Sequence, residues 1–346
     1  MKPIALRLFR IIMSIIAIIC MVVFVPWLAG CAYVKPLPST VQEQVSDATN
    51  YDLDGIIVYV DKKGRPPEYY SAGWKNREHK VPADPHALFK TASISKLYIA
   101  AATAKLISQK QLSLDKTLAD YLPELAGRIE NADHITLRMM LQHRSGIPNF
   151  IDDPKFPWEN LPADVNGLLK FGLDKPADFK PDSDYRYSNT NYLLIGMIID
   201  QTLGYSHHHF IKKEILDRLG LRHTYSLLSE VNLKDLVSGY YIGYDGDLKE
   251  QNFVGPGGSM VATAEDVGIF LRALNDGSLL SADEQTIYSS IYVSEHTGLL
   301  PGYSSIARYY SDIDTVVIQF VNTSGGNSWM ITEIIYKRIV KILRKH

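Results

Sequence analysis

The spacing of hydrophobic positions changes along the chain, and these changes predict its elements. Residues 11–29 form an almost unbroken apolar run after a basic start. Residues 55–60 (GIIVYV) are rich in β-branched and aromatic residues, DKKGRPP supplies a turn, and EYYSAGW returns, which predicts a β-hairpin. From Ser93 to Ile107 the apolar positions recur at helical spacing. The folded part is therefore expected to open with a hairpin and a helix.

The rest of the chain predicts a helical middle and a second group of strands. Stretches such as ITLRMMLQH and NYLLIGMIIDQTLG have helical spacing and are separated by Pro, Asp and Gly. Residues 263–266 (TAED) have the pattern of a capping box that opens another helix. Strand candidates SSIYVSEH, YSSIARYY and DTVVIQFVN follow, and a closing helix is expected to run to His346. No internal repeat is evident.

The first thirty residues are predicted to be a targeting segment rather than part of the fold. Leu28-Ala29-Gly30-Cys31 resembles the lipobox of bacterial lipoproteins, in which the cysteine is lipidated and becomes the new N-terminus. We expect a lipoprotein signal peptide over residues 1–30, a polar tether over 31–50 and a lipid-anchored protein of the cell envelope. It would face away from the cytoplasm, at the outer membrane in a Gram-negative cell. An uncleaved transmembrane anchor is the alternative, because the apolar run is just long enough to span a bilayer.

Composition limits the classes of function. The 346 residues are 46% hydrophobic and 21% charged with a net charge of −2, which is typical of a water-soluble globule and not of a nucleic-acid-binding protein. Cys20 and Cys31 both precede the folded part, so no disulfide framework is expected. Three consecutive histidines, residues 207–209, diverge around a helix and cannot share one metal ion, so we predict that they lie at the surface. Neither a metal nor a cofactor is implied.

Ser93 and Lys96 carry the candidate chemistry. At spacing i, i+3 their side chains lie on one face of a helix, so the ammonium can reach the serine oxygen. Apolar neighbours would desolvate Lys96, which disfavours its charged form and suits it to accept a proton. Ser93 lies at the helix start, where free backbone N–H groups stabilise an oxyanion. S-x-x-K alone is a weak signal, because residues 113–116 match it again and are interpreted as a capping serine with a solvated lysine.

Two further motifs raise the specificity of the pattern. Tyr187-Ser188-Asn189 is the only Y-x-N and precedes a predicted helix, and His296-Thr297-Gly298 is the only H-x-G. With S-x-x-K they make the sequence resemble the serine hydrolases of the penicillin-recognising superfamily, in particular class C β-lactamase-like esterases and D-amino-acid peptidases. The stretches that follow the family's pattern are LFKTASISKLYIAAATAKLISQKQLSLDKTLADYLPEL, ITLRMMLQHRSGIPNF, YRYSNTNYLLIGMIIDQTLG and GGSMVATAEDVGIFLRAL.

The resemblance implies an α/β (α+β) fold of the β-lactamase/transpeptidase type, with an antiparallel sheet flanked by helices and a mostly helical insert. The serine hydrolase domain would cover residues 51–346, with its α/β part at 51–112 and 251–346 and its helical part at 113–250. Only about thirty residues separate the TAED helix from the H-x-G motif, so the rim of the site is expected to be open or trimmed.

The resemblance also assigns catalytic roles. Ser93 would be the nucleophile that forms an acyl-enzyme, and Lys96 would accept or relay its proton. Tyr187 would be the partner base or acid, because a neighbouring lysine cation favours the phenolate.

Further positions are implied to bind the substrate. Asn189 would orient the lysine and bind the substrate carbonyl or amide. His296 occupies the place of a lysine in β-lactamases, and the backbone N–H of Leu299, just after Gly298, would join that of Ser93 in the oxyanion hole.

The predicted function is therefore hydrolysis of an ester or amide, in a small molecule or a peptide, through acyl-Ser93. Histidine at position 296 removes a permanent cation that would hold a β-lactam carboxylate, so an esterase or a D-amino-acid or cell-wall peptidase fits better than a β-lactamase. The alternative is a non-turnover, penicillin-binding-type receptor or scaffold. The last helix is amphipathic and basic and is expected to pack on the sheet, with a secondary contact with anionic lipid.

Overall fold

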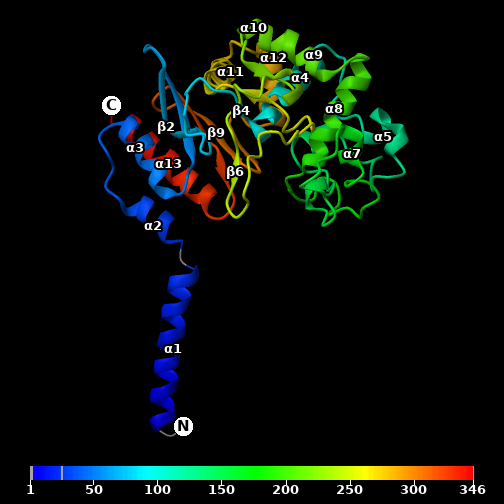
Figure 1. Ribbon diagram of the computed structural model, residues 1–346. Coiled ribbons are helices and arrows are strands. Elements are labelled where there is room, and N and C mark those ends of the chain that lie inside the picture. Colours follow the sequence, from blue (N-terminus) through cyan, green and yellow to red (C-terminus); the bar gives the residue numbers. More distant parts are fainter. Residues whose placement is uncertain (1–2, 25, 346) are drawn as a thin grey trace.

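The main sheet joins the first strands of the chain to the last. The computed structural model describes residues 3–24 and 26–345 (Figure 1). Six strands are ordered β3-β2-β1-β10-β9-β8, and every neighbouring pair is antiparallel. Their bounds are β1 Gly55–Lys62, β2 Glu68–Asn76, β3 Val81–Pro82, β8 His296–Leu300, β9 Tyr303–Tyr310 and β10 Thr315–Val321. The mixed α/β fold with an antiparallel sheet is thus confirmed, as is the predicted hairpin, which is formed by β1 and β2.

Helices flank this sheet, and the adjoining lobe, which lies to the right in Figure 1, consists of helices joined by long loops. The helices of the described part are α1 Pro3–Phe24, α2 Trp27–Val34, α3 Val41–Ala48, α4 Ser95–Ser108, α5 Leu118–Tyr121, α6 Leu137–Leu141, α7 Val165–Leu169, α8 Asn189–Leu203, α9 His207–Ile211, α10 Asp217–Leu219, α11 Ala264–Asp276, α12 Ala282–Ile291 and α13 Ser328–Leu343. Two smaller sheets are also present, with strands β4 Phe89–Lys90, β7 Val261–Ala262 and β5 Thr224–Tyr225 in one and β11 Thr323–Ser324 beside β6 Tyr240–Tyr241 in the other.

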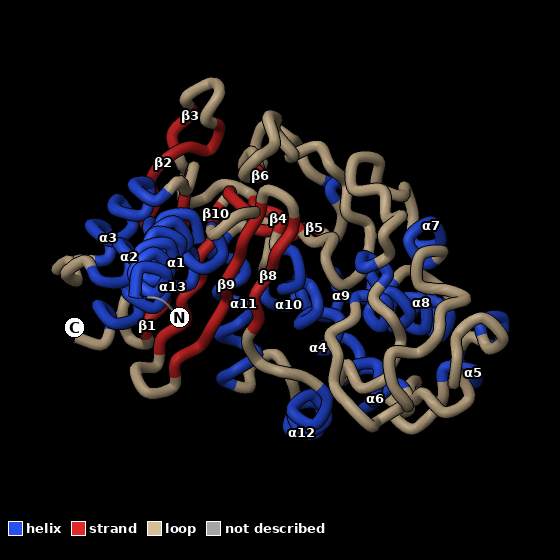
Figure 2. Tube along the Cα trace, turned by 90° about the horizontal axis from the view of Figure 1, so that it is seen from below, coloured by secondary structure: helices blue, strands red, loops and turns tan. Residues whose placement is uncertain are grey.

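Strand β1 is buried on both faces because helices cover the sheet from two sides (Figure 2). Ile56, Val58 and Val60 belong to a core with α3 and α13. Ile57 and Tyr59 point to the opposite face, as alternation along a strand requires, and belong to a larger core that includes α4 and α11. This larger core continues into the helical lobe and fixes α4 against the sheet.

The segment 289–296 differs from the strand predicted there. Ser281 caps α12 in a reciprocal capping box with Glu284, so helix extends to Ile291. Tyr288 and Ile291, three residues apart, are buried on the side of α12 that packs on α4. The strand β8 begins only at His296.

The predicted tether also differs from the structure, because much of residues 31–50 packs on the sheet domain. Helix α3 begins with a capping box between Thr40 and Glu43. Val41, Val45 and Ala48 recur at helical spacing and are buried in the core with α13. The polar residues between these positions lie mainly on the exposed side, which is why the segment has the composition of a linker.

Helix α1 extends away from the folded part (Figure 1), and Cys31 is exposed on α2. Among residues 3–24 and 26–345, no helix combines the length and apolar character needed to cross a membrane. Lys2 of the basic start, residue 25 of the predicted signal peptide and His346 of the predicted closing helix lie outside the described residues. The signal peptide, the lipidation of Cys31 and the domain boundaries stay predictions.

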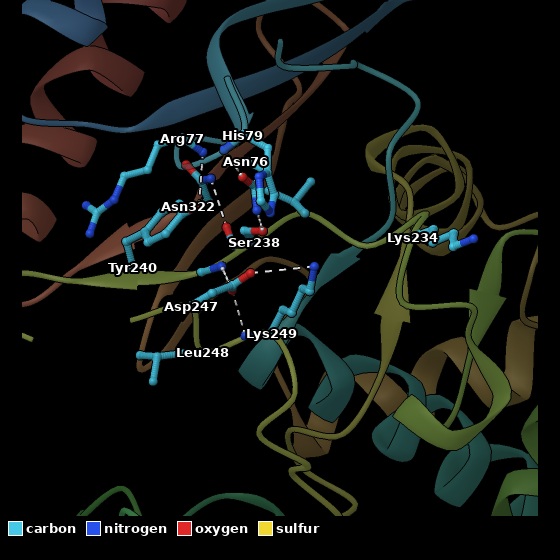
Figure 3. Close-up of polar contacts among 12 residues, drawn as sticks. Asn76, Arg77, His79, Lys234, Ser238, Tyr240, Asp247, Leu248, Lys249 and Asn322 are labelled. Carbon is cyan, nitrogen blue, oxygen red and sulfur yellow. Dashed lines mark hydrogen bonds and ion pairs between the residues drawn. The ribbon is translucent and has the colours of Figure 1, made fainter. Parts of the chain in front are cut away.

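A polar network joins the chain on either side of β6 and holds it against the sheet (Figure 3). Asn76 Nδ2 at the end of β2 donates to Ser238 Oγ over 2.9 Å, and Asn322 Nδ2 after β10 donates to the Ser238 carbonyl over 2.9 Å. Asp247 accepts from the backbone N–H of Lys249 over 2.9 Å. This network positions the chain just before residues 252–258, which form one wall of the candidate site.

Candidate active site

Ser93 lies in a sharp turn that connects β4 to α4. The turn is a 3₁₀ segment, Ala92–Ile94, and Ala92 has φ +53°, a left-handed conformation that is uncommon outside glycine. Ser95 Oγ donates to the Ala92 carbonyl over 2.6 Å and accepts from the Met260 N–H over 3.2 Å. These bonds hold the turn so that Ser93 stands at the N-terminal end of α4, where the helix dipole favours negative charge.

Lys96 is fully buried and directs its amine at three acceptors. Its Nζ lies 3.2 Å from Ser93 Oγ, 2.8 Å from Asn189 Oδ1 and 2.8 Å from the Gly257 carbonyl. Burial without a carboxylate partner among the described residues lowers the pKa of Lys96 to about 7. Both the ammonium and the neutral amine are therefore populated near neutral pH, as a proton acceptor requires.

Gly257 is a glycine because the lysine lies so close to it. A Cβ at this position would meet Lys96 Nζ and Tyr192 Cβ at 2.9 Å. The sequence indicated only a turn at GPGG, and this carbonyl acceptor was not predicted.

Tyr187 approaches the nucleophile from the other lobe. Its hydroxyl donates to Ser93 Oγ over 2.8 Å. Burial is the largest influence on the phenol and raises its pKa, although the bond to Ser93 acts in the opposite direction. The expectation that a lysine cation would favour the phenolate is therefore wrong, because desolvation raises the pKa of the phenol and lowers that of Lys96. Tyr187 is protonated at rest and suited to donate.

Strand β8 passes beside the nucleophile turn as the edge strand of the sheet. A Cβ on Gly298 would lie 2.4 Å from the Thr91 carbonyl and 2.8 Å from Ala92 Cβ, so only glycine allows this approach. Because β8 pairs with β9 on one side only, backbone groups on its other edge are free of the ladder. Leu299 follows on this edge strand and is 55% exposed.

A pocket of about 100 Å³ opens on Ser93. Asn189 and Leu299 line it, whereas His296 and Gly298 do not. Among the described residues that line it none is charged, and most are apolar: Phe150, Ile151, Phe156, Trp158, Leu161, Leu168, Leu193, Phe253, Val254, Leu299, Leu300 and Pro301.

Comparison with known proteins identifies the family. The family model described as "Beta-lactamase" matches residues 38–290. The chain belongs to the β-lactamase family. Its members share the fold of the serine hydrolases that the sequence resembles.

The relatives of this β-lactamase-family protein align with different fractions of its length. A β-lactamase of Pseudomonas fluorescens is 29% identical over 57% of this chain and 54% of its own length. Penicillin-binding protein 4* of Bacillus subtilis is 23% identical over 73% of this chain and 65% of its own length, so the chain spans less than two thirds of either. The D-amino acid amidase of Ochrobactrum anthropi SV3, solved with L-phenylalanine amide, has the same fold, with a TM-score of 0.78, 22% identity and coverage of 88% of this chain and 97% of that one.

His296 is held neutral in this β-lactamase-family site. Its Nδ1 contacts the carbonyl of Thr297, which can only accept, so the ring proton is on Nδ1. Nε2 is then an acceptor, and Tyr292 OH donates to it over 2.8 Å. Burial lowers the pKa of His296 to about 4, and nearby Lys96 acts in the same direction. The ring is therefore uncharged near neutral pH, and neither nitrogen is free to hold a substrate carboxylate.

His143 positions the loop that carries Tyr187. It is buried, stacks on the Tyr187 ring with centroids 4.4 Å apart, and its Nδ1 accepts from the Ser188 N–H over 3.2 Å. Burial lowers the pKa of His143 to about 3, so the ring stays neutral and Nδ1 stays an acceptor. Asn149 supports the same loop, because its Oδ1 accepts from the N–H of Asn189 over 3.0 Å.

These positioning residues were missed by sequence reasoning, although ITLRMMLQHRSGIPNF contains both His143 and Asn149. The only signal was the agreement of this stretch with the family's pattern. The predicted surface position of the histidines at 207–209 is wrong for His207, which is 3% exposed and contacts Asp200 Oδ1 through Nδ1 over 2.8 Å. The structure thus brings Ser93, Lys96, Tyr187 and Asn189 together, and their roles remain predictions.

We expect the Tyr292→Phe variant to raise the pKa of His296 by about half a unit to one unit, because the hydrogen bond that it removes stabilises the neutral ring. Long-range ¹H–¹⁵N NMR during an acid titration gives the pKa and the tautomer of the ring. In the wild type His296 should carry its proton on Nδ1 and titrate near pH 4. A His296 that is already protonated at pH 6 in the wild type would contradict the neutral arrangement.

Proposed function

We propose that this protein hydrolyses an ester or amide through an acyl-enzyme on Ser93. The observation that carries the proposal is the position of Ser93 Oγ, 3.2 Å from Lys96 Nζ and 2.8 Å from Tyr187 OH. A nucleophile, a desolvated amine and a protonated phenol in mutual contact are what nucleophilic catalysis requires. The same contacts disfavour a receptor that no longer turns over, because it would have no physical reason to keep all three.

In the proposed acylation, Lys96 is the base and Tyr187 the acid. The neutral amine takes the proton of Ser93 as Oγ attacks the carbonyl carbon. The phenol gives its proton to the leaving oxygen or nitrogen when the tetrahedral intermediate collapses. This leaves the acyl ester, an ammonium on Lys96 and a phenolate on Tyr187.

Deacylation returns both protons. Water gives one proton to the phenolate and attacks the ester, and the ammonium returns its proton to the departing Ser93 oxygen. The negative carbonyl oxygen of each tetrahedral intermediate would accept from the backbone N–H groups of Ser93 and Leu299. The free edge of β8 and the start of α4 support this assignment.

We further propose that the substrate is uncharged where it enters the pocket, with an apolar side chain or acyl group. The uncharged apolar lining supports an apolar group, since a charged one would lose its hydration there. The neutral His296 removes the means of binding a carboxylate next to the scissile bond. The L-phenylalanine amide in the solved amidase has an apolar side chain and no carboxylate. Amides and esters of apolar amino acids are therefore preferred to β-lactams and to peptides with a free terminal carboxylate.

The proposed location is the cell envelope, with a lipid on Cys31 as the membrane anchor. The lipobox-like residues 28–31 and the exposed, free Cys31 thiol support this proposal. Lipidation there would place the hydrolase domain outside the cytoplasm.

Replacement of Ser93 by alanine should lower kcat/KM for p-nitrophenyl butyrate about a thousandfold or more, because no other group can form the acyl ester. Thermal unfolding should be nearly unchanged. Ser113→Ala, which alters the second S-x-x-K, is the matched control and should keep full activity. An unchanged rate in the Ser93→Ala variant contradicts the assignment. Labelling of the wild type by a fluorophosphonate without turnover of any ester or amide would favour the non-turnover receptor.

The pH dependence should report the ionisation of Lys96. Below about pH 7 the ammonium cannot accept a proton, so kcat/KM for an uncharged ester should rise about tenfold per pH unit and then level off above pH 7. Burial also lowers the pKa of Lys90 to about 7, but its amine donates to the carbonyls of Leu248 and Gln251 rather than to Ser93. The Lys90→Met variant should therefore keep the inflection. A flat wild-type profile between pH 5 and 9 would contradict Lys96 as the base.

The preference for uncharged substrates can be measured with a matched pair. N-acetyl-D-phenylalanyl-D-alanine amide should be cleaved with kcat/KM about tenfold or more above that of the same peptide with a free carboxylate, and the L-series should be compared in parallel. His296→Lys supplies a cation and should reduce this ratio. Equal or faster cleavage of the carboxylate form by the wild type would exclude the proposed substrate class.

A further inference from the structure

Helix α2 presents an apolar side to solvent. Ala29 and Ala32 face inward and are buried in the core with α13, so the opposite side and the end of the helix face outward. Tyr33 is 71% exposed and Val34 is 76% exposed, and Cys31 is exposed beside them. Contiguous exposed apolar side chains often mark an interaction surface. Cleavage at the predicted lipobox would remove Ala29 but keep Ala32, Tyr33 and Val34, so Ala32 would hold the remaining turn in the core.

A cationic groove of about 630 Å³ adjoins this apolar side of α2. Tyr33 and Lys35 line one wall, and residues of α13 and the segment after it line the other, including Lys337, Lys341 and Arg344. Five of the ten lining residues are lysine or arginine, and none of the ten is acidic. We call the groove together with Tyr33 and Val34 the α2–α13 face.

Arg338 forms a fixed positive charge in the groove. It is 6% exposed, and its guanidinium donates to Gln44 Oε1 over 2.6 Å, to the Lys35 carbonyl over 2.6 Å and to the Pro36 carbonyl over 2.8 Å. All three acceptors are neutral. The charge of this arginine is therefore not cancelled by these contacts and adds to the potential of the groove.

Carboxylates close to the groove reduce its charge only in part. Asp47 pairs with Lys35 at 2.5 Å, Asp312 with Arg344 at 2.9 Å, and Glu333 with Lys337 at 3.6 Å. Three carboxylates thus oppose five cations, and exposed pairs of this kind are weak. The groove therefore keeps a net positive charge, and the apolar side chains of Tyr33 and Val34 lie beside it.

We propose that the α2–α13 face docks on the surface of an anionic lipid bilayer. Aromatic and aliphatic side chains beside lysine and arginine fit the interface of acyl chains and negatively charged headgroups. Charge complementarity selects this partner, because an apolar patch on another protein would leave the cations unpaired. Docking would fix the orientation of the hydrolase domain on the membrane and does not depend on the proposed reaction.

The test is lysine footprinting of the full-length chain reconstituted into vesicles. Reductive methylation with formaldehyde and dimethylamine–borane, both uncharged, is followed by mass spectrometry. In phosphatidylcholine vesicles with a third of phosphatidylglycerol, Lys35, Lys337 and Lys341 should react about fivefold or more slowly than in pure phosphatidylcholine vesicles. Lys170 and Lys213, which are exposed and do not line the groove, should react equally in both. High salt should remove the difference, because it screens the charges.

Variants separate docking from the effect of an anchor. Lys337→Glu combined with Lys341→Glu should abolish the protection of Lys35, whereas the control Lys212→Glu with Lys213→Glu should keep it. Equal reactivity in both kinds of vesicle means that an anchor alone holds the protein and overturns the proposal. Protection that follows the protein-to-lipid ratio rather than lipid charge means that a second copy covers the face, which also overturns it. Thermal unfolding in detergent shows that each variant is folded.

Discussion

The site depends on the burial of one amine. Lys96 has no exposed surface and is surrounded by neutral acceptors, so its proton is held less tightly than in water. A carboxylate in place of Asn189 would stabilise the ammonium and remove its capacity to accept a proton. Besides the Ser93 hydroxyl, the amine contacts the amide of Asn189, and the glycine at 257 lets a carbonyl approach closely. These neutral neighbours accept hydrogen bonds from the buried amine, and they do not hold it in its charged form.

Three separate parts of the chain must meet around this amine. The nucleophile turn follows β4, Tyr187 and Asn189 come from the start of α8, and Gly257 comes from the segment before β7. Each part is held by its own contacts. Strand β8 packs against the nucleophile turn, and His143 and Asn149 hold the Tyr187 loop. The network around Ser238 and Asp247 positions the chain before residues 252–258. The geometry around Lys96 thus depends in part on His143, Asn149, Ser238 and Asp247, none of which lines the pocket.

The parts of the site that the sequence predicted are those encoded locally. Ser93 and Lys96 are three residues apart on one helical turn, and Tyr187 and Asn189 form a short motif, so spacing and resemblance were sufficient. Gly257 and Tyr292 were missed because their importance comes from contacts over distance, such as the 161 residues between Gly257 and Lys96. The direction of the Tyr187 pKa shift was also missed, since it depends on how completely the phenol is buried. The spacing of residues along the sequence does not show how completely a side chain is buried.

The two errors in the predicted fold have the same kind of cause, namely contacts between distant parts of the chain. Helix α3 was assigned to a tether because its buried positions are few and its exposed ones are polar. The SSIYVSEH segment contains β-branched and aromatic residues, yet α12 begins with a capping box five to eight residues upstream and, with Tyr288 and Ile291 buried against α4, continues as far as Ile291. In both cases packing against a distant element decided the structure.

The bond between Tyr187 and Ser93 crosses the boundary between the two lobes. The nucleophile turn is fastened to the sheet, where Ser305 Oγ on β9 donates to the Thr91 carbonyl over 2.9 Å, whereas Tyr187 belongs to the helical lobe. A shift of one lobe against the other by an ångström or two would leave every side chain intact and still separate Tyr187 OH from Ser93 Oγ. A molecule wedged at the lobe boundary would therefore act as a remote inhibitor of the proposed reaction, and substitutions there would abolish that reaction without unfolding the protein.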